Sequence, residues 1–463
     1  MGQQNSRSIS SNKRLTLKNK SFKDSGKYNE KKNTVKYLND EYYYEQYVKH
    51  TNAGLKEELL DEFSDKLNSD AKNLLALNAI SGNDFSKVLL NREITINDIH
   101  VFSEKIELEG KSTNQKSSGR CWLFAATNVM RFLENIIELA DEDIDSRIIQ
   151  YLIQAPVNDG GQWDMVINIL EKYGVVPKSA FPESYNSSNS SKLNWLVTTK
   201  LRDFAYHLRE LHNAGKDHNT LRCVKIGMME EIYRIIAISI GEPPKKFDWT
   251  FRDKNGKYHN YPNLTPKSFY QDIIGYKATE TLSLINDPRN PYNRLYTVKY
   301  LGNIQGGFPI RYVNISIEMM KQLSIKVLRS GKPVWFGSDV GKGSYSPLGI
   351  LDNKVIDYEL GFNVKFELTK AQRLQYGQSL MTHAMVLTGV HIENDIPVRW
   401  RVENSWGDAI GDKGYFVMTD DWFTDWVYQI VLEKKDTPKE LVEVLDQEPQ
   451  VLPAWDPMGS LAI

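Results

Sequence analysis

Cysteine is scarce in this sequence, with Cys121 and Cys223 as the only two among 463 residues. Two thiols cannot build the disulfide framework of a small secreted domain, so a reducing compartment, most simply the cytoplasm, is expected. Long apolar runs are also missing: none approaches the ~18 residues of a membrane helix, and the N-terminal stretch lacks the apolar core of a secretory signal. Charge of one sign is not in excess, because 58 Lys and Arg face 59 Asp and Glu. The chain as a whole therefore has no electrostatic reason to bind nucleic acid or a membrane.

Residues 1–36 differ from the rest, because they hold ten Lys or Arg, two acids and few apolar side chains. Such a segment cannot bury enough apolar surface to become ordered, so residues 1–54 are predicted to be a basic, disordered tail. The first residues, MGQQNS, fit the pattern for N-myristoylation at Gly2, and a lipid beside basic residues would hold a membrane-associated pool. Weak phosphate contacts with nucleic acid, a mitochondrial transit peptide and a solvated tail are the alternatives.

Helical patterns come first in the remaining chain, and strand patterns follow. Helices are predicted over residues 122–140, 193–211 and 223–240, and a Lys-Asn-Gly turn at 254–256 predicts a hairpin between two short strands. Beyond about residue 330, strands are predicted over residues 334–339, 383–392, 399–407 and 415–423. Helices followed by strands indicate an α+β protein.

The stretch QKSSGRCWLFAATN surrounds Cys121 with features of an activated thiol. Gly119 permits a tight approach to the backbone, and the predicted helix over 122–140 would place the thiol at the positive end of its dipole. That position lowers the pKa of a cysteine and makes it a better nucleophile. A buried structural cysteine is the alternative for such a residue on its own.

Four further residues have chemistry that would complete a thiol hydrolase. His383 opens the apolar run HAMVLTGV, and Asn404 lies in VENSWG, where its side-chain oxygen can orient an imidazole and Trp406 can shield the hydrogen bond. Gln115, six residues before Cys121, can donate its amide to an oxyanion. Each also has an ordinary explanation, which is a structural histidine, a tryptophan-anchored turn or a solvated glutamine.

The order Gln, Cys, His, Asn in the stretches QKSSGRCW, THAMVLTGV and RVENSWGDAIGDKGY resembles that of papain-like cysteine peptidases. His383 and Asn404 follow Cys121 by 262 and 283 residues, where ~130–150 is usual in that family, and the excess corresponds to an insertion at 185–300. The insertion, the stretch APVNDGGQWDM and the ending LPAWDPMGSLAI are similar to the bleomycin hydrolase branch of the family.

The resemblance implies an α+β, papain-like fold in which a helical subdomain packs against a β-barrel-like subdomain. The implied parts are a tail at 1–54, a helical subdomain with the nucleophile at 55–184, a mainly helical insertion at 185–300, a β-rich subdomain with His and Asn at 301–440, and a C-terminal arm reaching the active site at 441–463.

The resemblance also implies a cysteine aminopeptidase, which removes N-terminal residues from peptides with free N-termini and also acts on bleomycin and homocysteine thiolactone. By resemblance, Cys121 is the nucleophile, His383 the base and acid, Asn404 the residue that orients the imidazole, and Gln115 the oxyanion donor. No cofactor is implied. A metal site is not expected either, because no second Cys or His spacing would give a structural zinc its four ligands.

Substrate contacts and assembly follow from the same resemblance. Gly160, Gly161 and Trp406 would bind the substrate, although an ordinary loop also explains the two glycines. The family forms a homohexameric ring, and the carboxylate at the end of its C-terminal arm meets the free amine of the substrate. Removal of Ile463 would leave the Ala462 carboxylate in this role, and a frayed end is the alternative.

The sequence departs from the family after CWLFAATN, where this chain passes directly from Arg131 to Phe132. A segment that completes the central helix is missing here, and a faulty gene model would have the same appearance. The gap motivates an alternative function, a catalytically impaired papain-like ring that binds nucleic acid or a membrane through its basic tail.

Overall fold

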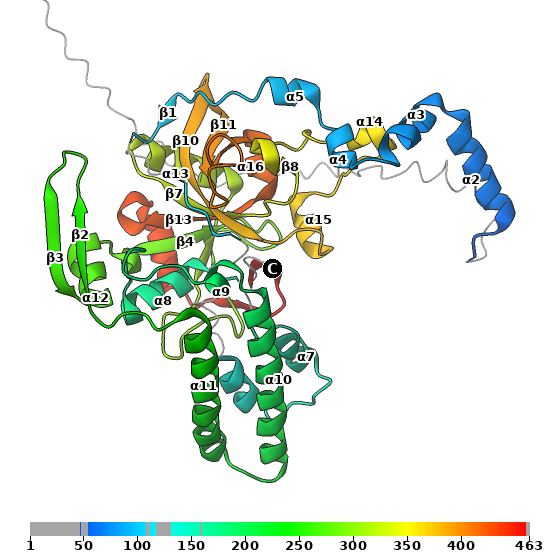
Figure 1. Cartoon of the computed structure of the whole chain (residues 1–463). Coiled ribbons are helices and arrows are strands. Elements are labelled where there is room, and N and C mark those ends of the chain that lie inside the picture. The colour runs from blue at the N-terminus through cyan, green and yellow to red at the C-terminus, as the bar shows by residue number, and fades with distance from the viewer. Residues whose placement is uncertain (1–46, 48–53, 108–111, 117–130, 158–159, 460–463) are drawn as a thin grey trace, which may run out of the picture. The chain divides into compact units, whose positions relative to one another are not determined.

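The chain divides into two units, residues 1–60 and residues 61–463. In the computed structural model the described residues are 47, 54–107, 112–116, 131–157 and 160–459 (Figure 1). Helix α2 (Glu57–Ser69) is the first described helix. The basic tail predicted for residues 1–54 lies almost wholly outside the described residues, and Gly2 lies outside them.

Short helices with polar caps follow α2 in the second unit. They are α3 (Ala71–Ile80), α4 (Phe85–Val88) and α5 (Arg92–Ile96). The side chains of Asp70, Asp84 and Asn91 accept hydrogen bonds from backbone N–H groups in the first turn of each helix. A cap of this kind contributes ~1 kcal/mol, so these helices begin where their sequence places an Asp or Asn.

Two long helices, α10 (Ser191–Asn213) and α11 (His218–Ile240), form a hairpin whose arms lie side by side in Figure 1. α10 buries apolar residues at every third or fourth position, and they pack with α7 (Arg147–Gln154) and with the helical residues 131–138 in one apolar core. The helices predicted over 193–211 and 223–240 are confirmed. The predicted helix over 122–140 is observed in its second half, and residues 122–130 lie outside the described part.

A 12-stranded sheet dominates the described β structure, in the order β14, β5, β6, β4, β13, β7, β10, β11, β12, β9, β8, with β1 paired to β10. Its strands are β1 (Glu104–Lys105), β4 (Thr281–Ile285), β5 (Leu295–Val298), β6 (Tyr312–Asn314), β7 (Val334–Ser338), β8 (Ser344–Tyr345), β9 (Ile350–Leu351), β10 (His383–Glu393), β11 (Ile396–Glu403), β12 (Tyr415–Thr419), β13 (Val427–Glu433) and β14 (Gln450–Leu452). β7, β10 and β11 are antiparallel neighbours, and His383 lies opposite Ser338.

The main apolar core lies on this sheet, where α13 (Ile317–Arg329) packs against β7, β10 and β13. The other described helices are α8 (Trp163–Tyr173), α9 (Tyr185–Ser188), α12 (Pro266–Ser268), α14 (Tyr358–Phe362), α15 (Lys370–Gln375), α16 (Asp420–Trp426), α17 (Lys439–Val442), the π-helical η2 (Phe269–Ile274), and the 3-10 turns η3 (Ala278–Glu280), η4 (Ser346–Leu348), η5 (Lys434–Asp436), η6 (Glu443–Asp446) and η7 (Pro457–Gly459). The predicted combination of a helical part and a β-rich part is confirmed.

The hairpin and the strands predicted over 334–339 and 383–392 are observed, and the strand predicted over 399–407 is observed as far as Glu403, where β11 ends. The hairpin consists of β2 (Phe247–Arg252) and β3 (Tyr258–Leu264). The strand predicted over 415–423 is wrong beyond Thr419, because its hydroxyl accepts a hydrogen bond from the backbone N–H of Trp422 at 3.3 Å and starts α16. The predicted boundaries between subdomains stay predictions; residues 281–298, at the end of the predicted insertion, supply β4 and β5 of the large sheet.

Searched over the described residues, the structure contains no helix long and apolar enough to cross a membrane.

Candidate active site

His383 and Asn404 form a hydrogen-bonded pair at the ends of two adjacent strands. His383 is the first residue of β10, and Asn404 follows the last residue of β11. Imidazole Nε2 lies 2.9 Å from Asn404 Oδ1, and both side chains are buried. The antiparallel pairing of β10 with β11 brings together two residues that are 21 positions apart.

The hydrogen bonds of Asn404 determine which imidazole nitrogen carries a proton. Its Oδ1 also accepts from the backbone N–H of Ser405 at 2.7 Å, which identifies this atom as the amide oxygen. His383 Nε2 must therefore donate to it, so in the neutral imidazole the lone pair is on Nδ1. Burial lowers the pKa of His383, and the hydrogen bond to Asn404 opposes that change. The imidazole is thus oriented to accept a proton through Nδ1.

Trp406 covers this pair. Its ring stacks on the His383 imidazole with centroids 4.9 Å apart and an interplanar angle of 30°, and Phe416 supports it edge-on at 5.9 Å. An apolar cover keeps water from competing for the hydrogen bond between His383 and Asn404. The sequence predicted the position of Trp406, but not the support from Phe416.

Gln115 lies beside the same segment through a double contact with Ser405. The backbone N–H of Gln115 donates to the Ser405 carbonyl at 2.8 Å, and the Ser405 hydroxyl donates to Gln115 Oε1 at 2.7 Å. Because Oε1 faces Ser405, the amide nitrogen is the donor end of this side chain. Gly407, at φ 86°, permits the close approach, since a Cβ there would lie 2.3 Å from Asn114 Nδ2.

Of the remaining predicted site residues, the structure describes two and leaves two outside its described part. Gly160 is buried and Gly161 is half-buried, just before α8. Cys121 and Ala462 lie outside the described residues. The structure thus brings His383, Asn404, Trp406 and Gln115 together, while their catalytic roles stay predictions. Among the described residues, no group of three or more His, Cys, Asp or Glu side chains is placed to hold a metal ion.

Sequence reasoning missed Ser405, which joins Gln115 to Asn404. The residue stands inside the motif VENSWG, directly after Asn404, so its position was visible. Its two contacts depend on a partner 290 residues earlier in the chain, and no local pattern reports such a pairing.

Comparisons with known proteins agree with this geometry. The Peptidase C1-like family profile matches residues 54–132 and 132–459. The bleomycin hydrolase of Rattus norvegicus is 42% identical over 452 residues, which cover 89% of this chain and 100% of that protein. Aminopeptidase C of Streptococcus thermophilus is 41% identical over 441 residues, with 87% and 99% covered. The crystal structure of PepW from Lactobacillus rhamnosis HN001 has a TM-score of 0.86 at 40% identity and covers 89% of this chain and 100% of its own.

The chain belongs to the Peptidase C1-like family. The resemblance to papain-like cysteine peptidases, and the fold class that it implied, are confirmed. The two matched segments meet at Phe132, where the sequence departs from the family. The match to the rat protein runs over 452 residues, whereas 89% of these 463 residues is about 412, so about 40 residues of that relative have no counterpart here.

Proposed function

We propose that this chain is a cysteine aminopeptidase that removes N-terminal residues from peptides. The observation that carries the proposal is the buried His383–Asn404 pair under Trp406, in a member of the Peptidase C1-like family. Relatives named bleomycin hydrolase and aminopeptidase C support it, and bleomycin and homocysteine thiolactone are further candidate substrates.

The proposed reaction has two stages. The Cys121 thiolate attacks the scissile carbonyl, and the oxyanion is stabilised by the Gln115 amide and the Cys121 backbone N–H. The His383 imidazolium then gives its Nδ1 proton to the leaving amine, so the C–N bond breaks and a thioester remains. His383 next takes a proton from water, the hydroxide attacks the thioester, and the acid product leaves with Cys121 restored. Gly160 and Gly161 border the peptide main chain, because residues without side chains let it approach.

The Ala462 carboxylate would select substrates with a free amine, once Ile463 is removed. The described part of the arm supports this role, because it packs into an apolar cluster that also contains residues next to His383. Tyr312 Oη donates to the Met458 carbonyl at 3.2 Å, and Met458 packs in one apolar cluster with Met381 and Ala384, which flank His383.

A homohexamer is the assembly that we propose, with the α10–α11 hairpin at its interfaces. Large apolar side chains are exposed on both helices: Trp195, Tyr206, Ile226, Tyr233 and Ile238. Such side chains commonly mark an association surface.

We also propose a cytoplasmic location, with minor membrane-associated or mitochondrial pools. Residues 1–36 are proposed to make weak contact with a membrane or nucleic acid. Binding assays at different salt concentrations, with and without residues 1–36, would test these contacts.

The proposal is tested by hydrolysis of fluorogenic aminoacyl amides. Activity in the unchanged protein and its loss in Cys121→Ala are expected, and equal turnover by both proteins would refute it.

A further inference from the structure

A buried carboxylate joins the ends of two neighbouring strands next to His383. Asp339 follows β7, and its carboxylate accepts hydrogen bonds from Ser379 Oγ at 2.8 Å and from Thr382 Oγ1 at 3.3 Å. Thr382 directly precedes His383, which in turn pairs with Ser338, the residue before Asp339. One side chain therefore fixes the end of β7 and the start of β10.

The hydrogen bonds among Tyr428, Ser379 and Asp339 run in one direction, from Tyr428 through Ser379 to the Asp339 carboxylate. Ser379 has one hydroxyl proton and donates it to Asp339, so its 2.7 Å contact with Tyr428 Oη is a bond that Tyr428 donates. Asp339, Ser379 and Tyr428 are all buried, so water does not compete for these bonds. Burial raises the pKa of the Asp339 carboxyl, and the bond from Ser379 opposes that change. A buried chain in which each donor has its acceptor favours a single geometry.

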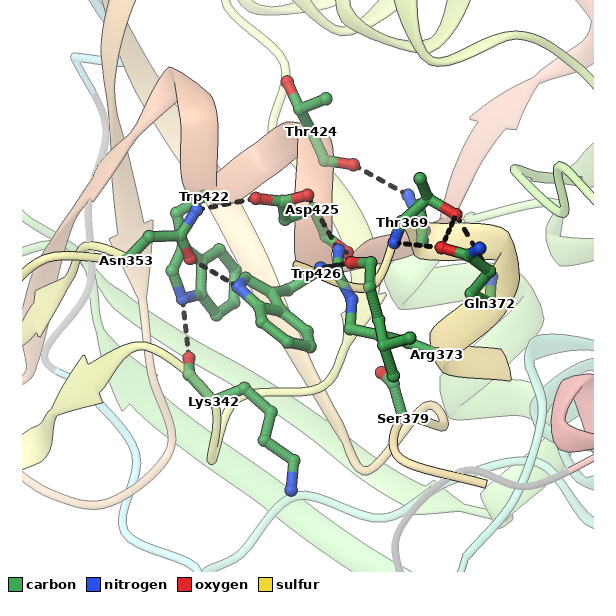
Figure 2. Close-up of polar contacts among 12 residues, drawn as sticks. Lys342, Asn353, Thr369, Gln372, Arg373, Ser379, Trp422, Thr424, Asp425 and Trp426 are labelled. Carbon is green, nitrogen blue, oxygen red and sulfur yellow. Dashed lines mark hydrogen bonds and ion pairs between the residues drawn. The ribbon is translucent and has the colours of Figure 1, made fainter. Parts of the chain in front are cut away.

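Helix α15 holds this chain of hydrogen bonds in place. Lys370 Nζ lies 4.7 Å from the centroid of the Tyr428 ring. Arg373 Nη2 donates to the Asp425 carboxylate at 2.7 Å, as Figure 2 shows, and the Ser379 backbone N–H donates to the Arg373 carbonyl at 3.3 Å. The segment from Ser379 to His383 is thus attached to α15 and α16 as well as to the sheet.

We propose that Asp339 is a positioning residue for the reaction: through Ser379 and Thr382, its carboxylate holds the start of β10 and so sets the position of the His383 imidazole. The inference rests on the proposed function, in which Nδ1 of this imidazole exchanges protons with Cys121 and the substrate. Since a displacement of about 1 Å at a reacting group costs about 100-fold in rate, the loss of a bond one or four residues before His383 is expected to affect turnover more than substrate binding.

Two matched serine variants test the inference. Ser379→Ala removes the hydroxyl that donates to Asp339. The control, Ser283→Ala, removes a hydroxyl elsewhere in the same sheet that accepts from Gln429 Nε2 at 3.1 Å. The two serines are equally buried, with 1% of each exposed. We expect kcat on an aminoacyl amide to fall about 10-fold in Ser379→Ala with KM nearly unchanged, and both constants to stay near those of the unchanged protein in Ser283→Ala. Asp339→Asn is the stronger variant, and Ser379→Ala keeps the test valid if Asp339→Asn does not fold.

Alkylation by iodoacetamide at about pH 6 separates positioning from a loss of stability, because it reports the thiolate at Cys121 in folded protein. The exposed Cys223 is the reference thiol in the same chain. We expect the ratio of Cys121 to Cys223 labelling to fall in Ser379→Ala and to stay constant in Ser283→Ala. Equal kcat values and equal ratios in the two variants would overturn the inference. Turnover that survives Cys121→Ala would instead refute the proposed function, and the inference with it.

Discussion

The Ser405 hydroxyl donates to the side-chain oxygen of Gln115 at 2.7 Å, across 290 residues of chain. The same residue donates its backbone N–H to Asn404 Oδ1. Ser405 therefore links the candidate oxyanion donor to the residue that orients the candidate base. This link leads to a prediction that distinguishes the role of Gln115, which donates to the oxyanion, from the role of Ser405, which holds the Gln115 amide in place.

Gln115→Ala is expected to lower kcat by about 100-fold or more, because one donor to the oxyanion is lost. Ser405→Ala leaves the amide in place but frees its orientation, so a smaller loss of about 10-fold is expected. Steady-state kinetics on one aminoacyl amide give both values. A Ser405→Ala protein as impaired as Gln115→Ala would show that Ser405 does more than hold the amide.

The raised pKa of Asp164 leads to the prediction that the stability of the protein depends on pH. Burial raises the pKa of this α8 carboxyl from 3.8 to about 7. The folded state thus holds its proton more tightly than the unfolded state, so stability is lost as pH rises from about 4 to about 7. At about 1.4 kcal/mol per pKa unit the full effect is about 4 kcal/mol, of which roughly 2–3 kcal/mol falls between pH 5 and pH 8.

Urea unfolding of Asp164→Asn against the unchanged protein measures this effect. The variant is expected to gain stability relative to the unchanged protein as pH rises from 5 to 8. If the free energies of unfolding of the two proteins differ by the same amount at pH 5 and pH 8, the pKa of Asp164 is not raised.

Replacement of Arg289 is predicted to change which substrates the protein selects. Its Nη2 donates to Asp287 at 2.9 Å and to Asp456 at 2.8 Å, and so attaches the C-terminal arm to the body of the second unit. Because loss of one member of a buried ionic group leaves the other charges uncompensated, Arg289→Gln should loosen the arm. We expect hydrolysis of N-blocked peptides to rise several-fold relative to free-amine peptides. Arg329→Gln, which removes an exposed pair with Glu104, is the matched control and should keep the original ratio.

The exposed face of the α10–α11 hairpin predicts the effect of a charge on assembly. Ile226 on α11 is 69% exposed, and Ile396 on β11 is 64% exposed. If the hairpin forms the interfaces of the ring, Ile226→Glu should lower the mass found by light scattering, since a charge is costly in a buried apolar contact. Ile396→Glu should leave the mass unchanged, and two variants with the same mass would count against this interface.

Much of the fold follows from local patterns in the sequence. The apolar period of residues 193–211 required a helix with one buried face, and α10 has that face. The error at 415–423 arose because an apolar run hid the helix start at Thr419, where Asp420 and Asp421 favour the first turn of α16. The Asp339–Ser379–Tyr428 group joins three separate segments, and only the folded sheet brings them together.

The catalytic role of Cys121 is the central claim, and one comparison tests it most directly. Hydrolysis of a fluorogenic aminoacyl amide is measured for the unchanged protein, Cys121→Ala and Cys223→Ala, which replaces the exposed second cysteine. The account predicts turnover that is abolished in Cys121→Ala and kept in Cys223→Ala, with all three proteins folded. Turnover that persists in Cys121→Ala, or its absence from the folded, unchanged protein, would contradict it.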